Sequence, residues 1–336
     1  MARAEDGAGK ESKRLRVVVW GLGHHAINRI LPAVSVVPGL ELYGVCSRNS
    51  GNVAACSQKW KCGGWTDAAS MLGDTSADII YVATPSGLHA EHGKHVLDAG
   101  KHLWCEKPLT CRLHDTLDLL ELSRMRRLSI CEGFMYLHHP HFRKLAEYIA
   151  SGRLGPIKAI GCRFGIPRLE HPGFRSEAAL GGGALFDVGC YPISALQALF
   201  PGHRPELRYA IVSARNGSAI DTDGQAIFAL HDGMAVTLEW GIDCAYRNEI
   251  DIWGQDSSMF SDKIFSKPAD YVPAFHFRDS HGVESTEYGE ASEHFSTMLQ
   301  GFRRMIDDSP AVEAERGSIG ERAELLDRVW SGFRAI

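Results

Sequence analysis

Arg16-Val-Val-Val-Trp20-Gly21-Leu-Gly-His-His-Ala26 is the stretch that decides the fold. A β-branched apolar run leads into a Gly-x-Gly-x-x-Ala turn, and a helical pattern continues to Val36 before the turn at Pro38-Gly39. Phosphates approach a helix N-terminus closely only where the turn lacks side chains, and the amide N–H groups there attract negative charge. Gly21 and Gly23 therefore predict a dinucleotide-binding turn, lined also by His24 and His25. An ordinary glycine-rich turn is the alternative.

Strand and helix patterns alternate on the C-terminal side of this turn. Strands are expected at Leu40–Cys46, Ala77–Ala83 and Lys101–Cys105, with helices at His89–Ala99 and Leu113–Arg127. This alternation predicts an α/β fold with a doubly wound parallel sheet, a Rossmann domain over residues 15–135. The polar segment 1–14 is expected to be a disordered leader.

Longer strands joined by glycine turns are expected in the second half of the chain. The candidates are Ile157–Ile166, Leu207–Ala214, Gly224–Leu230, Met234–Asp243 and Glu249–Trp253, followed by helices at Ala291–Asp307 and Ser318–Ala335. We expect a C-terminal α+β domain over residues 136–336, with an open, mostly antiparallel meander sheet covered by helices on one face. The open face predicts a homodimer or homotetramer.

Composition limits the classes of partner. The 336 residues are 44% hydrophobic and 23% charged with a formal charge of -5, which predicts large cores and argues against nucleic-acid binding. The polar N-terminus has no apolar segment, so no membrane partner is expected. The nine cysteines contain no Cys-x-x-Cys pair, which favours a reduced, cytoplasmic protein without a cysteine metal site.

The residues after the second expected strand indicate which dinucleotide is used. Enzymes that use NAD(H) carry an acidic residue there that binds the ribose hydroxyls. This chain has Cys46-Ser-Arg-Asn49 instead. Ser47 and Arg48 suit a 2′-phosphate, so NADP(H) is predicted over NAD(H); a solvated Arg48 is the alternative.

Two segments supply groups for proton and hydride chemistry. Trp104-Cys-Glu-Lys-Pro108 follows an apolar strand, where open α/β sheets bind ligands, and offers Glu106 and Lys107. Gly181-Gly-Gly-Ala-Leu-Phe-Asp187-Val-Gly-Cys-Tyr191 places Asp187 and Tyr191 on one side of a helix. Pro192 predicts an irregular first turn in that helix, and the three glycines predict either a close backbone approach to a cofactor or a flexible loop.

Further candidates surround these segments. Thr84 and Pro85 end a strand, and His89 follows where it would line a nicotinamide pocket. The candidate substrate contacts are Tyr136, His138, Arg175 and Tyr246, with packing or surface ion pairs as the alternative for each. The histidines form no zinc motif, so no metal site is expected.

Four motifs together carry a resemblance: Gly-Leu-Gly-His-His-Ala26, Thr84-Pro-Ser-Gly-Leu-His89, Ala99–Pro108 and Gly181–Asp187. The chain resembles the glucose-fructose oxidoreductase / inositol dehydrogenase (Gfo/Idh/MocA) family, in the branch that has Tyr rather than His at position 191. Gly133–Pro140, Phe164–Pro167 and Ala245–Asn248 are similar to the nucleotide-sugar 3-ketoreductases of that branch. The resemblance implies Lys107, Asp187 and Tyr191 as catalytic residues.

The expected function is hydride transfer between NADP(H) and a sugar carbonyl, most simply reduction of a nucleotide-linked keto sugar in deoxysugar biosynthesis. Either Tyr191 or Lys107 would deliver the proton; with Tyr191 as the donor, Lys107 makes the phenol more acidic and stabilises the developing alkoxide. One alternative is an NADP-dependent dehydrogenase of a free sugar or a cyclic vicinal diol. The other is a cofactor-binding sensor without turnover.

Overall fold

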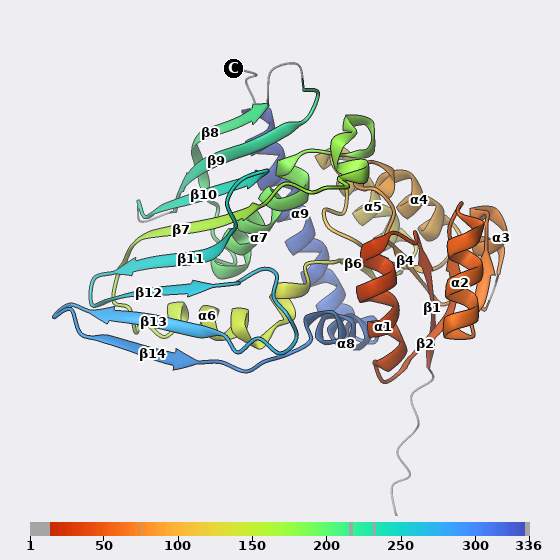
Figure 1. Cartoon of the computed structure of the whole chain (residues 1–336), viewed down its shortest axis with the longest axis horizontal. Coiled ribbons are helices and arrows are strands. Elements are labelled where there is room, and N and C mark those ends of the chain that lie inside the picture. Colours follow the sequence, from red (N-terminus) through yellow and green to blue (C-terminus); the bar gives the residue numbers. More distant parts are fainter. Residues whose placement is uncertain (1–13, 75, 215–217, 231–232, 333–336) are drawn as a thin grey trace, which may run out of the picture.

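The computed structural model describes the chain except residues 1–13, 75, 215–217, 231–232 and 333–336, so nearly all of the predicted leader lies outside the described residues. The first sheet is parallel throughout, with the strand order β3-β2-β1-β4-β5-β6 (Figure 1). Its strands are β1 (Leu15–Trp20), β2 (Leu40–Cys46), β3 (Gly63–Trp65), β4 (Ile79–Val82), β5 (His102–Cys105) and β6 (Ile130–Glu132). The predicted doubly wound sheet is confirmed.

Helices cover both faces of this sheet. They are η1 (Ala26–Ile30), α1 (Leu31–Val36), α2 (Ser50–Trp60), α3 (Ala68–Gly73), η2 (Ser86–Leu88), α4 (His89–Asp98) and α5 (Leu113–Met125). Successive β1 side chains alternate between the layers: Val17 and Val19 lie in one hydrophobic core and Val18 in the other. All three are fully buried, which explains why this strand is an unbroken apolar run.

The second sheet has eight strands in the order β14-β13-β12-β11-β7-β10-β9-β8. They are β7 (Ile157–Ile166), β8 (Glu206–Ala214), β9 (Asp221–Ala229), β10 (Ala235–Ile242), β11 (Arg247–Gly254), β12 (Ser257–Asp262), β13 (Ala274–Asp279) and β14 (Glu284–Tyr288). The expected simple meander is wrong, because β7 lies between β10 and β11 and runs parallel to β10. The other pairs are antiparallel, so the sheet is mixed but mostly antiparallel.

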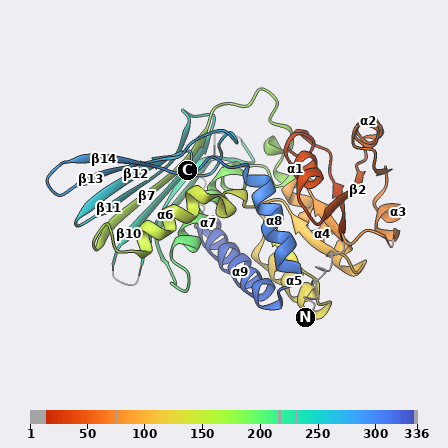
Figure 2. The ribbon, with the colours of Figure 1, turned by 90° about the horizontal axis from the view of Figure 1, so that it is seen from below.

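One face of this larger sheet is covered and the other is open. Figure 2 shows α6 (Pro140–Ala150), α7 (Cys190–Leu199) and α9 (Ser309–Ser331) along one face. The opposite face carries no helix in that view, and Trp253 of β11 is 64% exposed. The helical run Ala178–Leu199 has the length and composition of a membrane span, yet 78% of its most apolar stretch is buried inside the protein. That environment is typical of a core helix.

The last two helices join the two sheets. α8 (His294–Ile306) packs against α1, and α9 packs against α5 and β6; both lie between the sheets in Figure 1. α9 begins at Ser309 rather than at the predicted Ser318. Asp308 caps it by accepting from the Ala311 amide at 3.1 Å, and Pro310 occupies its first turn, where a proline is tolerated.

Candidate active site

A groove of about 1160 Å³ lies at the carboxyl ends of β1, β2 and β4. Gly21 has a φ of 109°, and a Cβ there would lie 2.5 Å from the carbonyl oxygen of Ala83. Only glycine fits that position. Gly23 has open space where a Cβ would stand. This bare turn at a helix start has the form that a dinucleotide pyrophosphate needs.

Eight of the predicted cofactor contacts line the groove: Gly21, Gly23, His24, His25, Ser47, Arg48, Thr84 and Pro85. The other three, His89, Glu106 and Lys107, line the adjoining cavity instead. Asp67 and Glu91 also line it, and neither was predicted. Asp67 already serves as the N-cap of α3, accepting from the Ser70 amide at 2.8 Å. His92 stacks on Trp20 with 4.0 Å between ring centroids, and both rings form part of the groove wall.

A second cavity of about 280 Å³ adjoins the groove, and the two share His25, Arg29, Ala83, Thr84, Phe174 and Arg175. Lys107, Asp187 and Tyr191 all line this cavity. The Lys107 Nζ donates to the Asp187 backbone oxygen at 2.5 Å and lies 3.3 Å from its Oδ1. It also lies 4.7 Å from the centre of the Tyr191 ring. The first sheet thus supplies an ammonium, and the segment before α7 supplies a carboxylate and a phenol at the same place.

Burial and neighbouring charges determine the ionisation states of Lys107 and Tyr191. Burial lowers the pKa of Lys107, but the anionic forms of Tyr191 and Asp187 outweigh it, and the net pKa lies above the ordinary value. Burial raises the pKa of Tyr191, and Lys107 offsets only part of that rise. Lys107 thus lowers the pKa of the phenol as predicted, but burial outweighs it and the net pKa lies above the ordinary value. At neutral pH the pair is an ammonium beside a protonated phenol.

Asp187 is held from both sides. Arg175 donates from Nε to the Asp187 Oδ2 at 2.6 Å, opposite Lys107. Burial raises the pKa of Asp187, whereas Lys107 and Arg175 lower it below its ordinary value. The carboxylate stays ionised and fixes the direction of the lysine side chain.

Glu106 and His89 position the Glu-Lys-Pro loop. Glu106 Oε1 accepts from the Tyr81 hydroxyl at 2.7 Å and lies 3.0 Å from His25 Nε2. His89 is fully buried, with its ring nitrogens 2.9 Å and 2.8 Å from the carbonyl oxygens of Pro108 and Thr84. His89 thus ties the loop after β4 to the loop after β5, and also lines the cavity.

The glycine run packs tightly instead of forming a flexible loop. A Cβ on Gly181 would lie 2.7 Å from the Gly87 nitrogen, and one on Gly183 would lie 2.0 Å from Asp221 Oδ1. The following turn is irregular as predicted, because Leu185–Gly189 is a π-helical turn (η6) that leads into α7.

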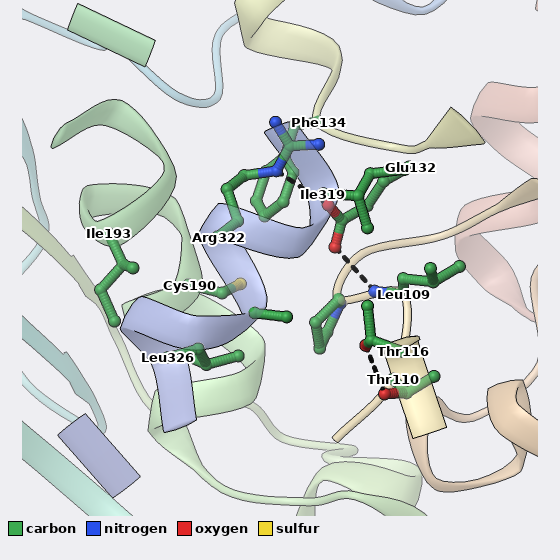
Figure 3. Close-up of a pocket in the computed structure, with 12 residues that line it drawn as sticks. Leu109, Thr110, Thr116, Glu132, Phe134, Cys190, Ile193, Ile319, Arg322 and Leu326 are labelled. Carbon is green, nitrogen blue, oxygen red and sulfur yellow. Dashed lines mark hydrogen bonds and ion pairs between the residues drawn. The ribbon is translucent and has the colours of Figure 1, made fainter. Parts of the chain in front are cut away.

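A buried ion pair holds the loop that carries Lys107. Figure 3 shows Arg322 of α9 directed at Glu132, the last residue of β6. Arg322 Nε donates to Glu132 Oε2 at 2.9 Å, and Glu132 Oε1 accepts from the Leu109 amide at 2.7 Å. Both side chains are at most 6% exposed. The C-terminal helix therefore holds the backbone two residues after Lys107.

Three of the predicted substrate contacts lie outside the residues that line the cavity. Tyr136 is fully buried and its hydroxyl lies 2.6 Å from Ser194 Oγ. His138 packs edge-on against Phe302, and Tyr246 is 49% exposed beside Asn248. Only Arg175 of the four lines the cavity. Sequence patterns missed Arg29, Lys267 and His294, which line it as well, because nothing local marks them.

No group of three or more His, Cys, Asp or Glu side chains that could hold a metal ion occurs among the described residues. Lys107 and Tyr191 supply ionisable groups beside the groove that is shaped for a dinucleotide.

Comparison with known proteins agrees with this geometry. The sequence profile described as "Oxidoreductase family, NAD-binding Rossmann fold" matches residues 15–134, and that of the "GFO/IDH/MocA C-terminal domain" matches residues 142–260. A dTDP-3,4-didehydro-2,6-dideoxy-alpha-D-glucose 3-reductase of Streptomyces violaceoruber is 29% identical, covering 94% of this chain and 95% of the relative. A D-xylose 1-dehydrogenase (NADP(+)) of Haloferax volcanii is 25% identical over 88% of this chain and 91% of its own length.

Solved structures extend the comparison. A 3-ketoreductase from Actinomadura kijaniata in complex with NADP and TDP-benzene superposes with a TM-score of 0.92 at 29% identity, covering 96% of this chain and 99% of its own. The two matching profiles span both halves of the chain. The protein is therefore an oxidoreductase of the glucose-fructose oxidoreductase / inositol dehydrogenase (Gfo/Idh/MocA) family.

Proposed function

We propose that this protein is an NADPH-dependent reductase of a nucleotide-linked keto sugar, acting in deoxysugar biosynthesis. The observation that carries the proposal is the meeting of Lys107 and Tyr191, 4.7 Å from ammonium to ring centre, in a cavity that opens beside the dinucleotide groove. The similar 3-ketoreductase from Actinomadura kijaniata in complex with NADP and TDP-benzene supports the same cofactor and ligand class.

The groove residues would hold the cofactor. Gly21 and Gly23 leave the backbone bare for the pyrophosphate, and Ser47 and Arg48 stand at the end of β2 where the adenosine ribose lies in this fold. The Arg48 guanidinium favours a 2′-phosphate. NADPH is therefore preferred over NADH in this proposal.

Tyr191 acts as the proton donor. When bound, the reduced nicotinamide supplies a hydride to the carbonyl carbon, and negative charge develops on the carbonyl oxygen. The Tyr191 O–H bond then breaks as a new O–H bond forms on the substrate, and solvent later returns the proton to the phenolate. A pKa above the ordinary value keeps Tyr191 protonated at neutral pH, and an alkoxide is basic enough to take that proton.

Lys107 stabilises the charge that appears during this transfer. Its ammonium is already directed by two Asp187 oxygens, so little reorganisation is needed when the alkoxide and then the phenolate form. Asp187 and Arg175 are positioning residues in this proposal, and Arg175 lines both the cavity and the groove.

The reverse reaction defines the second candidate function. The D-xylose 1-dehydrogenase relative favours oxidation of a free sugar, for which the same lysine and tyrosine would serve. A sensor without turnover has no need of an acid, so the joint presence of Lys107, Asp187 and Tyr191 argues against it.

A spectrophotometric screen tests the proposal. NADPH oxidation is followed with a panel of keto sugars and their dTDP and UDP conjugates, and NADP⁺ reduction with free sugars and cyclic diols. Reduction of one or more nucleotide-linked keto sugars is expected. Activity confined to free sugars or diols would transfer the assignment to the second candidate, and binding of NADPH without turnover of any substrate would favour the sensor.

Two wider features complete the proposal. The open face of the larger sheet, with Trp253, Tyr209 and Phe260 exposed, is the surface through which we expect a homodimer or homotetramer to form; sedimentation analysis tests this. All nine cysteines are free, which supports a cytoplasmic location.

A further inference from the structure

Lys267 is a buried cation that the reduction mechanism does not use. It lies between β12 and β13, is 7% exposed, and lines the same cavity as Lys107 and Tyr191. Its Nζ donates to the Ile264 backbone oxygen at 2.9 Å. Among the ion pairs of the described residues, none involves Lys267. An ammonium without a counter-ion in such a place costs free energy that an apolar side chain of similar size would not.

The loop that carries Lys267 is fixed rather than adaptable. Asn248 of β11 accepts from the Phe265 amide and donates to the Ser266 carbonyl, both at 2.8 Å. Phe265 is fully buried, with its ring centroid 5.5 Å from that of Tyr191. Lys267 is thus held at a set position in the wall of the cavity that contains the proposed proton donor.

The cavity as a whole carries an excess of positive charge. Four lysines or arginines line it (Arg29, Lys107, Arg175 and Lys267) against two carboxylates (Glu106 and Asp187), a net charge of +2. Both carboxylates are already engaged, Asp187 by Lys107 and Arg175 and Glu106 by His25 and Tyr81. Arg29 and Lys267 remain without an ion-pair partner among the described residues.

The histidines beside Lys267 are uncharged at neutral pH, so they add no positive charge to its surroundings. His294 is 4% exposed, and its Nδ1 has no hydrogen-bond partner. Burial lowers the pKa of His294 to about 3, helped by the charge of Lys267, and burial lowers that of His139 to about 4. Burial also lowers the pKa of Lys267 itself to about 7, a value that a bound anion would raise again.

We infer that Lys267 binds a phosphate group of the substrate, the diphosphate that links the sugar to its nucleoside. A sugar diphosphate diester carries one negative charge on each phosphate, so the positive charge of the cavity lining attracts it. Arg29 and Arg175 also line the dinucleotide groove, whereas Lys267 lines only the smaller cavity. This inference rests on the proposed function and names the part of the substrate that the cavity recognises. Lys267 would anchor the diphosphate while the sugar carbonyl reaches Tyr191.

The cofactor also carries phosphate groups, and the alternative is that Lys267 binds one of those. Lys267 lines the smaller cavity and is absent from the lining of the dinucleotide groove. The inference therefore predicts that Lys267→Met leaves the Kd for NADPH unchanged, which fluorescence titration of the variant measures.

Calorimetry and steady-state kinetics test the inference together. dTDP is titrated into the NADP⁺-bound wild-type, Lys267→Met and Lys267→Arg enzymes, and kcat and KM are measured with a dTDP-linked keto sugar and with the corresponding free keto sugar. A charged hydrogen bond to phosphate predicts a roughly 10- to 100-fold rise in the Kd for dTDP and in the KM for the linked substrate in Lys267→Met. The kinetic constants with the free sugar should not change, and Lys267→Arg should recover part of the affinity.

Lys263→Met is the matched control, since Lys263 belongs to the same loop but lies over the Tyr271 ring, outside the cavity lining. Thermal denaturation checks that each variant folds. Unchanged dTDP affinity in Lys267→Met overturns the inference, as does an equal loss of kcat with linked and free sugars, which would assign Lys267 to proton transfer. If the wild type binds dTDP through Lys267 yet reduces no linked keto sugar, the proposed reaction fails and the phosphate site stands.

Discussion

Replacing Arg322 by methionine should cost this protein about 3–5 kcal/mol in free energy of unfolding, the range for breaking a buried ion pair. Arg322 and Glu132 are 6% and 5% exposed and meet at 2.9 Å. Arg322 also lies 3.1 Å from Glu315. The substitution removes the cation that Glu132 and Glu315 share. The loss of stability arises because both carboxylates then lack a counter-ion in a largely buried place.

The Arg322→Met substitution should also lower catalytic activity. Glu132 accepts from the Leu109 amide, so a carboxylate that loses Arg322 no longer fixes the loop that carries Lys107. We expect kcat to fall while the Kd for NADPH stays near the wild-type value, since no groove residue changes. Urea unfolding followed by circular dichroism gives the stability, and NADPH oxidation gives kcat.

Arg124→Met is the matched control for this prediction. Arg124 makes two ion pairs, with Glu121 and Glu313, but all three side chains are at least 52% exposed, so its loss should cost about 0–1 kcal/mol. If Arg322→Met were as stable and as active as Arg124→Met, the ion pair would not hold the loop and the reasoning would be refuted.

Three further predictions concern the groove and the proton donor. Arg48→Ala should lower kcat/KM for NADPH roughly 10- to 100-fold, the value of one charged hydrogen bond, and leave that for NADH unchanged; equal losses with both cofactors would contradict the 2′-phosphate assignment. Gly21→Ala should destabilise the protein by more than about 1 kcal/mol and weaken NADPH binding, because its φ is 109° and its Cβ would approach Ala83. Gly73→Ala, with open space and no positive φ, is the control in the same thermal and fluorescence measurements. Burial raises the pKa of Tyr191, so the protonated donor persists to higher pH than a free phenol. The kcat for reduction, measured at saturating substrate so that ionisation of the substrate-binding Lys267 does not enter, should fall only above about pH 10; a fall of kcat near pH 7 would point to another acid.

The first half of the fold could be predicted because its signals are local. The apolar run before Gly21 and the Gly-x-Gly turn specify a strand and a helix start within a dozen residues. Lys107 could be placed at the ligand-binding edge of the first sheet because the carboxyl ends of parallel strands meet there. Its meeting with Tyr191 was implied only by the family resemblance.

The second half depends on long-range packing that no local pattern encodes. β7 pairs with β10 across an intervening stretch of helices and strands, so the turn signals alone suggested a meander. β12 to β14 went unpredicted because they are short and rich in polar residues, and their pairing partners make them strands.

The side chains that line the cavity could not be predicted from local sequence patterns either. Lys267 sits in the Ser266-Lys-Pro268 segment, which reads as an ordinary surface loop. Only the anchoring of that loop by Asn248 buries the lysine. Likewise, Tyr136 was a candidate substrate contact, but it is fully buried and packs against Tyr191 with 5.8 Å between ring centroids.

Turnover of the Tyr191→Phe enzyme tests the central claim most directly. The substitution removes one hydroxyl from a buried ring and leaves the groove intact, so the Kd for NADPH should equal that of the wild type. NADPH oxidation with the preferred keto sugar should fall by roughly two to four orders of magnitude, the usual contribution of a positioned general acid. Turnover within a few-fold of the wild type would show that a different group gives the proton.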